Sequence, residues 1–478
     1  MKMSKPHIAI LGAGPSGVGA AYRLMKNEKA KITVLEARDR VGGNAGSFER
    51  HGIHLDYGSH RLHPACKPDI LEEIHSLLGN DLLKRPRHGR IRLNNRWIHF
   101  PIQFSDMIRK LPLGFSGGVF SDMVKKSISG KVLRSDRNDN FAAVLRKKLG
   151  KTICDEFYFP YAKKIWGLEP DQIASIQAEK RVSADSFTKL IKKVFLKSLS
   201  KSGEKVPFFY YPKRGYGQIS DAYYHKAEQL GADFRFKSKV IGLHTEGSKI
   251  KSVKYEHGGE QKSIEADLIW STLPITLTAK MMSPEPDSSV INAADRMRFR
   301  SMVLIYLFLE QDRFSEYDAH YFPEEKIPIT RLSETKNYYS ATMPTNLTCI
   351  CAELPCSVDD EYWTMGQEEA KSVVVESLNR AGLLIGSDVK EIVIRKIKQA
   401  YPIYDLGFES HLETLNHYFG TFQNMILFGR QGLFVHDNTH HALHMAYSAS
   451  ECVDSEGKFD HNLWSNYLME FESHVVED

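Results

Sequence analysis

The chain opens on a short apolar run, a glycine-rich turn, a helical pattern and a second apolar run. The first run covers residues 7–11 and leads into the turn at 12–17, and the second run, 32–35, ends in Glu36. Short apolar runs bounded by turn residues predict buried strands, and apolar positions at helical spacing predict a helix. Strand, helix and strand in this order predict a β-α-β unit with parallel strands over residues 7–37.

Further along, the hydrophobic pattern alternates between the helical and the strand period. The stretch 105–201 is helical and basic, and residues 299–400 have the pattern of strands around one helix at 367–381. Shorter elements are predicted as helices over 67–78, 219–230 and about 440–452, a hairpin over 91–101 that turns at Asn94-Asn95, a second hairpin around Gly258-Gly259, a strand pair at 233–236 and 240–243, and buried strands over 268–274 and 425–428.

The closing strand, turn and helix indicate that the first and last parts of the chain share one domain. No internal repeat or low-complexity tract interrupts the pattern. We therefore expect a discontinuous dinucleotide-binding domain from residues 1–66, 210–272 and 406–478, a mostly helical cap over 67–209, and a mixed-sheet substrate-binding domain over 273–405.

Composition places the chain among globular proteins of more than one domain. It has 478 residues, 42% of them hydrophobic and 26% charged, and a net charge of +5, which gives no reason to expect a nucleic-acid partner. The six cysteines are scattered without the paired spacing of zinc sites, so we expect free thiols in a reducing, cytoplasmic setting. No apolar leader precedes residue 7, and the longest apolar run, 302–309, is too short to span a bilayer.

The opening turn has the residues that dinucleotide binding requires. Gly12 permits a tight turn, Gly14 lets backbone N–H groups approach a pyrophosphate, and Gly17 lets the helix pack closely on the strand. The N-terminus of the helix presents its positive dipole end to the phosphates, and Glu36 can accept hydrogen bonds from a ribose diol. The sequence therefore predicts a dinucleotide site at this turn.

The run 36–43, with its Gly42-Gly43 pair after the acidic residue, resembles the FAD-binding unit of the glutathione-reductase and amine-oxidase group of flavoenzymes. This resemblance implies an α/β fold of the two-dinucleotide-binding-domain, glutathione-reductase type, with FAD as the cofactor, an inserted helical cap and a mixed-sheet substrate domain. The FAD-binding residues that it implies are Gly12, Gly14, Pro15, Ser16, Gly17, Glu36, Ala37, Arg38, Gly42, Gly43, Asn44, Tyr57, Gly58, Ser59, Val240, Gly429, Arg430, Asn438, Thr439 and Ala442.

Within that group the chain is most similar to UDP-galactopyranose mutases and to protoporphyrinogen-oxidase-like proteins. The likeness is carried by the stretches 57–63, 161–176, 328–336 and 429–442, and it extends over nearly the whole length. It implies His60, His63, Trp166 and Arg331 as catalytic residues. The substrate-binding residues that it implies are Trp166, Arg181, Tyr211, Arg331, Tyr401, Phe434 and His436.

The chain also departs from the mutase pattern. Ser183 stands where mutases have a second active-site arginine, although Lys180 or Arg181 could substitute, and Phe434 and His436 stand where mutases have tyrosines. Two functions follow as hypotheses. The first is a flavoenzyme for a sugar-nucleotide or glycosyl substrate, with NAD(P)H or another reductant as partner and either net oxidation or redox-neutral chemistry at flavin N5. The second is an amine-oxidase-like enzyme that abstracts hydride from a non-sugar substrate.

Two further features allow more than one interpretation. His436, His440, His441 and His444 suggest a metal site, but no further ligand follows at clear spacing, so we expect no metal and a wet wall beside the substrate. The basic segment 189–205 either lies on an anionic membrane surface or, as is commoner for such helices, packs on its own protein.

Overall fold

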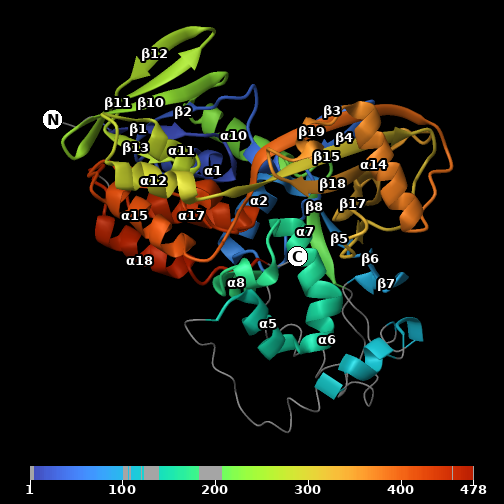
Figure 1. The fold of residues 1–478 in the computed structure, drawn as a ribbon. Helices are drawn as coiled ribbons and strands as arrows, with labels where there is room; N and C mark the ends of the chain where they lie inside the picture. The colour runs from blue at the N-terminus through green and yellow to red at the C-terminus, as the bar shows by residue number, and fades with distance from the viewer. Residues whose placement is uncertain are drawn as a thin grey trace.

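The computed structural model shows two lobes side by side and a helical region beneath them (Figure 1). The predicted basic segment 189–205 lies outside the described part of the chain. The described residues are 5–100, 106, 109–112, 114–119, 121–122, 139–181, 207–454 and 456–476.

A five-stranded parallel sheet forms the centre of the first lobe. Its middle strand β1 (His7–Leu11) pairs with β2 (Lys31–Leu35) on one side and with β13 (Leu268–Ser271) on the other. The outer strands are β20 (Met425–Leu427), beside β13, and β9 (Asp233–Arg235), beside β2. Strands β1, β2, β13 and β20 are buried along most of their length because helices cover both faces of a parallel sheet, whereas the edge strand β9 is not. Strands that are far apart in sequence thus meet in one sheet.

Helix α1 packs tightly against one face of this sheet. Gly19 of α1 lies so close to α17 that a Cβ there would come within 2.8 Å of Leu443 Cδ2. Gly19 thus permits close packing between α1 and α17. The predicted packing of α1 on the strand depends on Gly17, where a Cβ would lie 2.0 Å from the Gly12 carbonyl oxygen and 3.6 Å from Ile10 Cγ2. The helices of this lobe are α1 (Pro15–Lys26), α2 (Pro68–Leu78), α10 (Gln218–Gln229), α11 (Ile275–Lys280), α12 (Ser288–Arg296), α15 (Phe408–Gly420), α17 (Thr439–Glu451) and α18 (His461–Phe471).

A smaller sheet extends from the same lobe. Its central strands β10 (Ser238–Glu246) and β11 (Lys249–His257) form an antiparallel hairpin, with β12 (Glu260–Ile264) and β14 (Met282–Ser283) at the edges. The predicted strand pair at 233–236 and 240–243 is therefore divided, because β9 joins the parallel sheet and β10 joins this one. The connecting residue Lys237 has a positive φ of 52°, which turns the chain between the two sheets.

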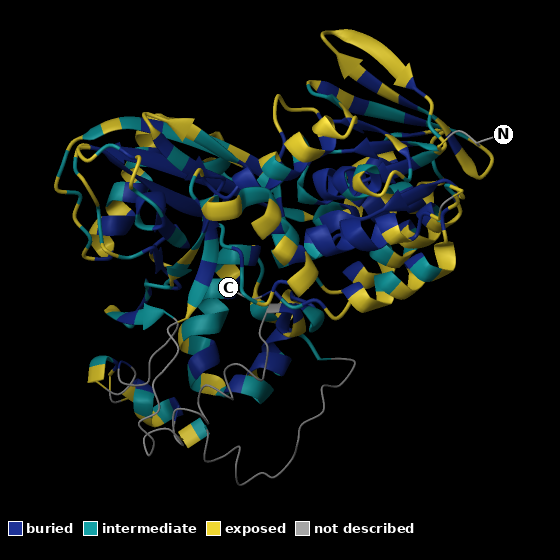
Figure 2. Ribbon diagram, turned by 180° about the vertical axis from the view of Figure 1, so that it is seen from behind, coloured by how far each residue is buried: buried dark blue, intermediate teal, exposed yellow. Residues whose placement is uncertain are grey.

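The second lobe is built on a seven-stranded mixed sheet with the order β19-β15-β18-β17-β16-β6-β7. Its long strand β15 (Phe299–Leu309) is buried almost throughout, which explains the apolar run at 302–309 (Figure 2). The hairpin β6–β7, within the residues assigned to the cap, adds to this sheet through β16. The other strands are β6 (Gly89–Leu93), β7 (Arg96–Phe100), β16 (Ala319–Tyr321), β17 (Arg331–Glu334), β18 (Thr348–Cys356) and β19 (Val389–Pro402).

Further helices and two two-stranded sheets, β3-β4 and β5-β8, belong to the described structure. Helix α14 (Gln367–Arg380), which agrees with the predicted helix at 367–381, packs on the seven-stranded sheet after the short α13 (Glu361–Thr364). The remaining helices are α5 (Phe141–Leu149), α6 (Lys151–Ile153), a π-helical turn (Cys154–Tyr158), α7 (Phe159–Trp166), α8 (Ile176–Arg181) and α16 (Gly429–Gly432), and the remaining strands are β3 (Ser47–Arg50), β4 (Ile53–Asp56), β5 (Leu82–Pro86) and β8 (Phe208–Pro212).

Most elements predicted from periodicity are confirmed, including the helices at 67–78, 219–230 and 440–452 and the hairpin that turns at Asn94-Asn95. Both asparagines have positive φ, 51° and 61°, as a two-residue hairpin turn requires. The domain boundaries themselves stay a prediction. In the described part of the chain, no helix combines the length and apolarity needed to cross a bilayer.

Lys164 connects helix α7 to the loop between β16 and β17. Its ammonium group donates to the carbonyl oxygens of Phe322, Glu324 (3.2 Å) and Ile329 (2.9 Å). Burial lowers the pKa of Lys164 to about 7. Because β17 begins two residues after Ile329, this contact also positions the start of that strand.

A Lys164→Met variant is expected to lose about 2–4 kcal/mol of unfolding free energy, since three carbonyls lose a shared donor. Chemical denaturation checks this value. Lys163→Met is the matched control: Lys163 is exposed, and the described residues that it pairs with are the exposed Glu169 and Glu325, so the loss is expected to stay below about 1 kcal/mol. Equal losses in both variants would contradict the role assigned to Lys164.

Candidate functional site

A cavity of about 500 Å³ lies at the carboxyl ends of the parallel strands. Gly12, Glu36, Thr272 and Gly429, which follow β1, β2, β13 and β20, all line it. This edge of an open α/β sheet is where ligands generally bind. The remaining lining residues are Gly14, Pro15, Ser16, Arg38, Gly43, Asn44, Ala45, Ser59, His60, Arg61, His63, Arg87, Phe209, Tyr216, Leu273, Pro274, Arg331, Lys396, Ile397, Lys398, Gln399, Arg430, Gln431, Asp437, Asn438, Thr439 and Ala442.

The opening turn leaves space for a phosphate group beside Gly14. A Cβ at Gly14 would meet no atom closer than the Cα of Gly43, at 4.0 Å, whereas one at Gly17 would lie 2.0 Å from the carbonyl oxygen of Gly12. Gly12 also has a φ of 99°. Gly17 is thus required for packing inside the protein, and Gly14 keeps open a cradle in front of the N-terminus of α1.

Glu36 is held in place for a ribose. Its carboxylate oxygens accept hydrogen bonds from the backbone N–H groups of Ala13 and Arg38, each at 2.8 Å. The side chain is largely buried yet lines the cavity. Each carboxylate oxygen has a further lone pair, so Glu36 can still accept from a ribose diol.

A second wall closes over the cradle. Gly42 and Gly43 have positive φ values of 103° and 54°, and Arg38 donates to the Gly43 carbonyl at 2.9 Å. From the other side, Arg430 donates to the Ala400 carbonyl at 2.8 Å. The residues around the cradle therefore fit FAD: Gly14 and the start of α1 would hold its pyrophosphate, Glu36 its ribose and Arg430 its negative charge.

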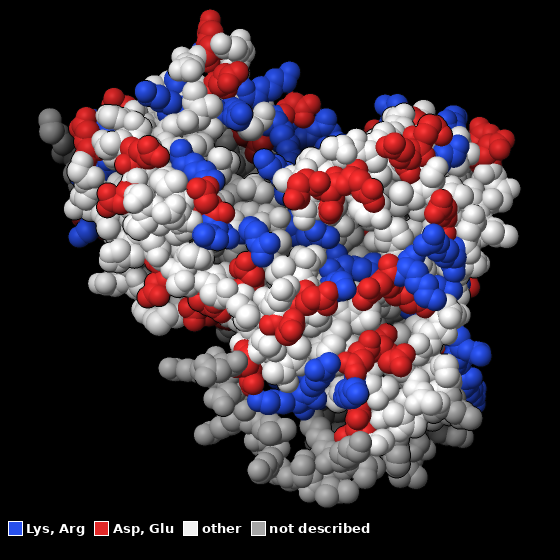
Figure 3. Space-filling model, viewed as in Figure 1, with Lys and Arg blue, Asp and Glu red and all other residues white. Residues whose placement is uncertain are grey.

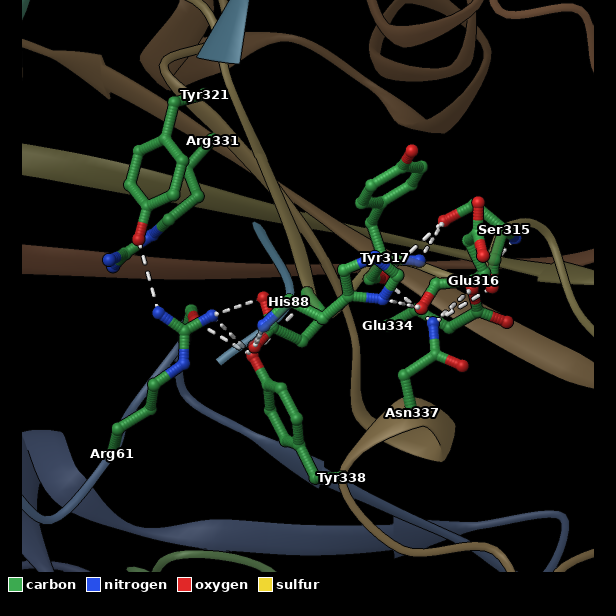
Figure 4. Close-up of polar contacts among 12 residues, drawn as sticks. Arg61, His88, Ser315, Glu316, Tyr317, Tyr321, Arg331, Glu334, Asn337 and Tyr338 are labelled. Atoms are coloured by element: carbon green, nitrogen blue, oxygen red, sulfur yellow. Dashed lines mark hydrogen bonds and ion pairs between the residues drawn. The ribbon is translucent and has the colours of Figure 1, made fainter. Parts of the chain in front are cut away.

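The opposite end of the cavity contains a network of charged and aromatic side chains (Figure 4). Arg61 donates to the Tyr321 hydroxyl at 3.1 Å and forms an ion pair with Asp318 at 3.2 Å. Arg331 forms a bidentate pair with Glu353, in which Nε and Nη2 each lie 2.8 Å from a carboxylate oxygen. Glu353 also accepts from Ser59 N at 2.7 Å, so it connects the 57–63 loop to β17.

Basic side chains predominate on the cavity wall. Space filling shows Lys and Arg gathered in the hollow between the two lobes (Figure 3). The acidic residues on the wall are Glu36 and Asp437. The basic ones are Arg38, Arg61, Arg87, Arg331, Lys396, Lys398 and Arg430. This surplus of positive charge favours an anionic ligand.

His60 lies within the cavity between these charges. Its ring stacks on Tyr216 with centroids 5.3 Å apart, and its Nδ1 lies 3.2 Å from the Gly58 carbonyl oxygen. Burial, with the charges of Arg331 and Arg430, lowers the pKa of His60 to about 4. His60 is therefore a neutral imidazole at physiological pH.

We expect the His60 signal of FAD-free protein to titrate near pH 4 in an NMR experiment, with His60→Gln used to assign it. Because the folded state favours the neutral ring, the contribution of His60 to stability is lost as the pH falls from the ordinary pKa near 6.5 towards 4. A midpoint near 6.5 would show that the ring is solvated instead.

Several residues predicted to bind substrate lie away from the cavity. Tyr211 is 1% exposed and its hydroxyl donates to buried Asp56 at 2.7 Å, so it belongs to the core. Phe434 is fully buried and packs edge-on against Phe299 at 5.0 Å. The prediction that these two side chains reach substrate is not supported, because apolar packing and a hydrogen bond to Asp56 hold them inside.

Trp166, Tyr401 and His436 form an aromatic cluster behind the cavity wall. The Trp166 ring lies 4.9 Å from that of His436 and 5.8 Å from that of Tyr401. Arg430 lies 4.9 Å above the Tyr401 ring, so the cluster supports a cavity residue without lining the cavity itself. Arg181 ends α8, and its side chain lies outside the described part.

Six predicted FAD residues also lie off the cavity wall. Gly58, with a φ of 91°, turns the backbone next to Glu353, and Tyr57 is buried beneath Arg395, 4.0 Å above its ring. Val240 is buried in β10 opposite Tyr255. The others are Gly17, Ala37 and Gly42.

Some wall residues were missed by the sequence reasoning. Thr272 and Pro274 follow a predicted buried strand, so the rule that ligands bind at carboxyl ends of parallel strands could have identified them. Arg61 stood inside the 57–63 motif without being chosen. No local signal marked Lys396 and Lys398, because their approach to the cavity depends on how β19 packs.

The fit of the cavity to FAD agrees with the proteins that this chain resembles. Residues 15–393 match the family described as flavin containing amine oxidoreductase. The chain is 38% identical to polyamine oxidase 4 of Oryza sativa subsp. japonica over 81 residues, about a sixth of the length of either chain. It is 20% identical to protoporphyrinogen oxidase 2 of Arabidopsis thaliana, over 87% of each.

Solved structures share the fold over the whole chain. A reduced UDP-galactopyranose mutase superposes with a TM-score of 0.79 at 19% identity and covers 99% of both chains. A protein described as a putative protoporphyrinogen oxidase from Exiguobacterium sp. 255-15 gives 0.72 at 16% identity, covering 94% of this chain and 98% of its own. The family match over residues 15–393 shows that the chain belongs to the flavin containing amine oxidoreductase family. Together with the fit of the cavity, this membership identifies the cofactor as FAD.

Proposed function

We propose that the protein is an FAD-dependent enzyme, built on the glutathione-reductase type of fold, that acts on an anionic substrate of the sugar-nucleotide or glycosyl class. The observation that carries this proposal is the surplus of basic over acidic side chains on the cavity wall. The FAD pyrophosphate neutralises part of this charge. At the far end Asp318 and Glu353 offset Arg61 and Arg331, and Lys396 and Lys398 of β19 add positive charge that no described carboxylate pairs. A second anionic group is the ligand that such a wall attracts.

The residues of the far end would bind and orient the substrate. Arg331 keeps a fixed direction because Glu353 holds Nε and Nη2, and no described residue reaches its Nη1. That N–H group can donate to a phosphate oxygen. Neutral His60 can donate or accept a hydrogen bond without adding charge. Bound FAD supplies hydride transfer or, when reduced, nucleophilic chemistry at N5.

The resemblance to UDP-galactopyranose mutase supports a uridine diphosphate sugar as the first substrate to test. Purified protein should be yellow, and its extracted chromophore should be FAD. It should then be incubated with UDP-galactopyranose and UDP-galactofuranose, with and without dithionite, and the sugars separated by chromatography. Interconversion that requires the reduced flavin supports the mutase reaction, and no change of either sugar contradicts it.

An Arg331→Ala variant tests the substrate-binding role. It is expected to bind UDP roughly 10- to 100-fold more weakly, since one charge-assisted hydrogen bond contributes about 1.5–3 kcal/mol. Arg298→Ala is the control, because Arg298 is half-exposed and pairs with Asp405 instead of lining the cavity. Unchanged UDP affinity in Arg331→Ala would remove Arg331 from the proposed site.

An oxidoreductase acting on a non-sugar anion is the second candidate. Two observations favour it: Glu353 neutralises Arg331, and Phe434 offers no hydroxyl to a diphosphate. The basic wall argues against a cationic polyamine, which it would repel. Bleaching of oxidised flavin by a porphyrinogen or another anionic reductant under anaerobic conditions, without any effect of UDP-sugars, would decide for this candidate.

A further inference from the structure

A chain of buried hydrogen bonds runs from the cavity wall to the protein surface. Asp437 lines the cavity, and its Oδ2 lies 2.8 Å from Nδ1 of His474. Nε2 of His474 lies 3.2 Å from Nδ1 of His444. Nε2 of His444 lies 2.6 Å from Nζ of Lys67, which also donates to Glu470 at 2.7 Å. Segments before α2, in α17 and after α18 are thus joined through side chains alone.

The two ends of this chain fix the direction of every bond in it. The Lys67 ammonium can only donate, so Nε2 of His444 must accept and Nδ1 of His444 must carry the proton. His444 then donates to Nε2 of His474, which leaves the His474 proton on Nδ1, directed at Asp437. All three links therefore point from the surface to the cavity, as a proton relay requires.

The inner groups of the chain are shielded from bulk water, whereas its outer end is exposed. The side chains of Asp437, His474 and His444 are only 2%, 8% and 9% exposed, whereas Lys67 and Glu470 are nearly half-exposed. Among the described residues, bulk water therefore reaches the chain at Lys67 and Glu470, and the cavity reaches it at Asp437.

The surroundings of the chain keep His444 a neutral imidazole. Burial and nearby Lys67 lower the pKa of His444 to about 4, and burial raises the pKa of Asp437. The two shifts bring the proton affinities of the His444 imidazole and the Asp437 carboxylate closer together. The titratable groups that face the chain from the neighbouring segments are Asp69, Lys180, Arg430, His440 and His441.

We propose that Asp437, His474 and His444 form a proton relay between the flavin cavity and the surface at Lys67 and Glu470. For each proton that Asp437 releases into the cavity, His474 passes its Nδ1 proton to Asp437 and His444 passes its Nδ1 proton to Nε2 of His474. Lys67 passes a proton to Nε2 of His444 and regains one from water, and rotation of the two rings restores the Nδ1–H form. Each ring accepts on Nε2 and releases from Nδ1, and no electron or carbon bond takes part. The proposal rests on the flavin-dependent reaction proposed above, since two-electron flavin chemistry takes up or releases protons.

The tautomers give a test that does not depend on FAD or on activity. In FAD-free protein with 15N-labelled histidine, both His444 and His474 are expected as Nδ1–H tautomers, assigned by His444→Gln and His474→Gln. Lys67→Met removes the donor to Nε2 of His444, so His444 should then populate the Nε2–H tautomer as well. An Nε2–H tautomer of either ring in the wild type would overturn the relay.

Proton delivery is tested by bleaching of bound FAD with dithionite in a stopped-flow instrument, in H2O and D2O. His444→Gln and His474→Gln are expected to bleach roughly tenfold more slowly than wild type and to gain a solvent isotope effect, while their FAD content stays normal. His461→Gln is the matched control: His461 begins α18, and its Nε2 lies 3.0 Å from the Gln423 carbonyl oxygen, outside the chain.

A structural role would not respond to a small base. Added imidazole should restore the bleaching rate of His444→Gly, because His444 lies next to the exposed end. Unchanged rates and isotope effects in both Gln variants would overturn the relay and leave the proposed function intact. Absence of bound FAD in the wild type would instead contradict the proposed function, while the tautomer measurement would still report on the relay.

Discussion

A Gly14→Val variant will fold normally but bind FAD roughly 100-fold more weakly or worse, which corresponds to about 3 kcal/mol. The protein itself has room for the new side chain, because a Cβ at Gly14 meets nothing closer than 4.0 Å. The branched side chain would instead occupy the cradle where the FAD pyrophosphate approaches the backbone. FAD titration followed by flavin fluorescence measures the affinity, and thermal unfolding of the FAD-free protein measures the fold.

Two other glycines make this prediction specific. Gly386→Val is the matched control, since no atom lies within 4 Å of a Cβ there and the residue does not line the cavity; FAD affinity should not change. Gly17→Ala should lose stability even without FAD, because its Cβ would lie 2.0 Å from a backbone oxygen. If Gly14→Val retains FAD, the pyrophosphate does not lie at this turn.

Replacing Glu353 by leucine will destabilise the protein by about 3–5 kcal/mol, because the Arg331 guanidinium loses its carboxylate in a buried site. Glu353 is 4% exposed and Arg331 17%. The double variant Glu353→Leu/Arg331→Met should be more stable than Glu353→Leu alone, since it removes the unpaired charge. Urea denaturation of the two single variants and the double variant measures this coupling.

The control for this set of variants at 331 and 353 is an exposed pair of one arginine and one glutamate. Glu376 and Arg380 lie one helical turn apart, 67% and 55% exposed, so Glu376→Leu should change stability by less than about 0.5 kcal/mol. Additive losses in the double variant at 331 and 353 would mean that the two side chains do not stabilise each other. Arg331 would then be free to serve the cavity without its carboxylate partner.

Local sequence patterns predicted the parts of the fold that depend on neighbouring residues. The glycines of the 12–17 turn, the asparagines of the 94–95 turn and the alternation of apolar residues each constrain the backbone where they stand. The sequence pattern predicted less where a strand could pair in more than one sheet. Residues 233–236 and 240–243 both have strand patterns, but only tertiary packing sends one to the parallel sheet and the other to the smaller sheet.

The same distinction holds for the candidate site. Gly14, Glu36 and Gly429 were found from sequence because strand ends and glycine turns place them at the cavity directly. Tyr211 and Phe434 were assigned to the substrate, yet burial gave them partners in the core. Hydroxyl and aromatic side chains fit either setting, so residue type alone does not separate the two.

The amino-acid sequence by itself predicted a dinucleotide site at the first turn, and its resemblance to flavoenzymes predicted FAD as the cofactor. Only the tertiary structure decided that Arg331 faces the cavity as half of an ion pair, and that Asp437, His474, His444 and Lys67 meet in one hydrogen-bonded chain. The physical reason is range. Backbone turns are set by adjacent residues, whereas the charge and protonation of a buried group depend on partners that distant segments supply.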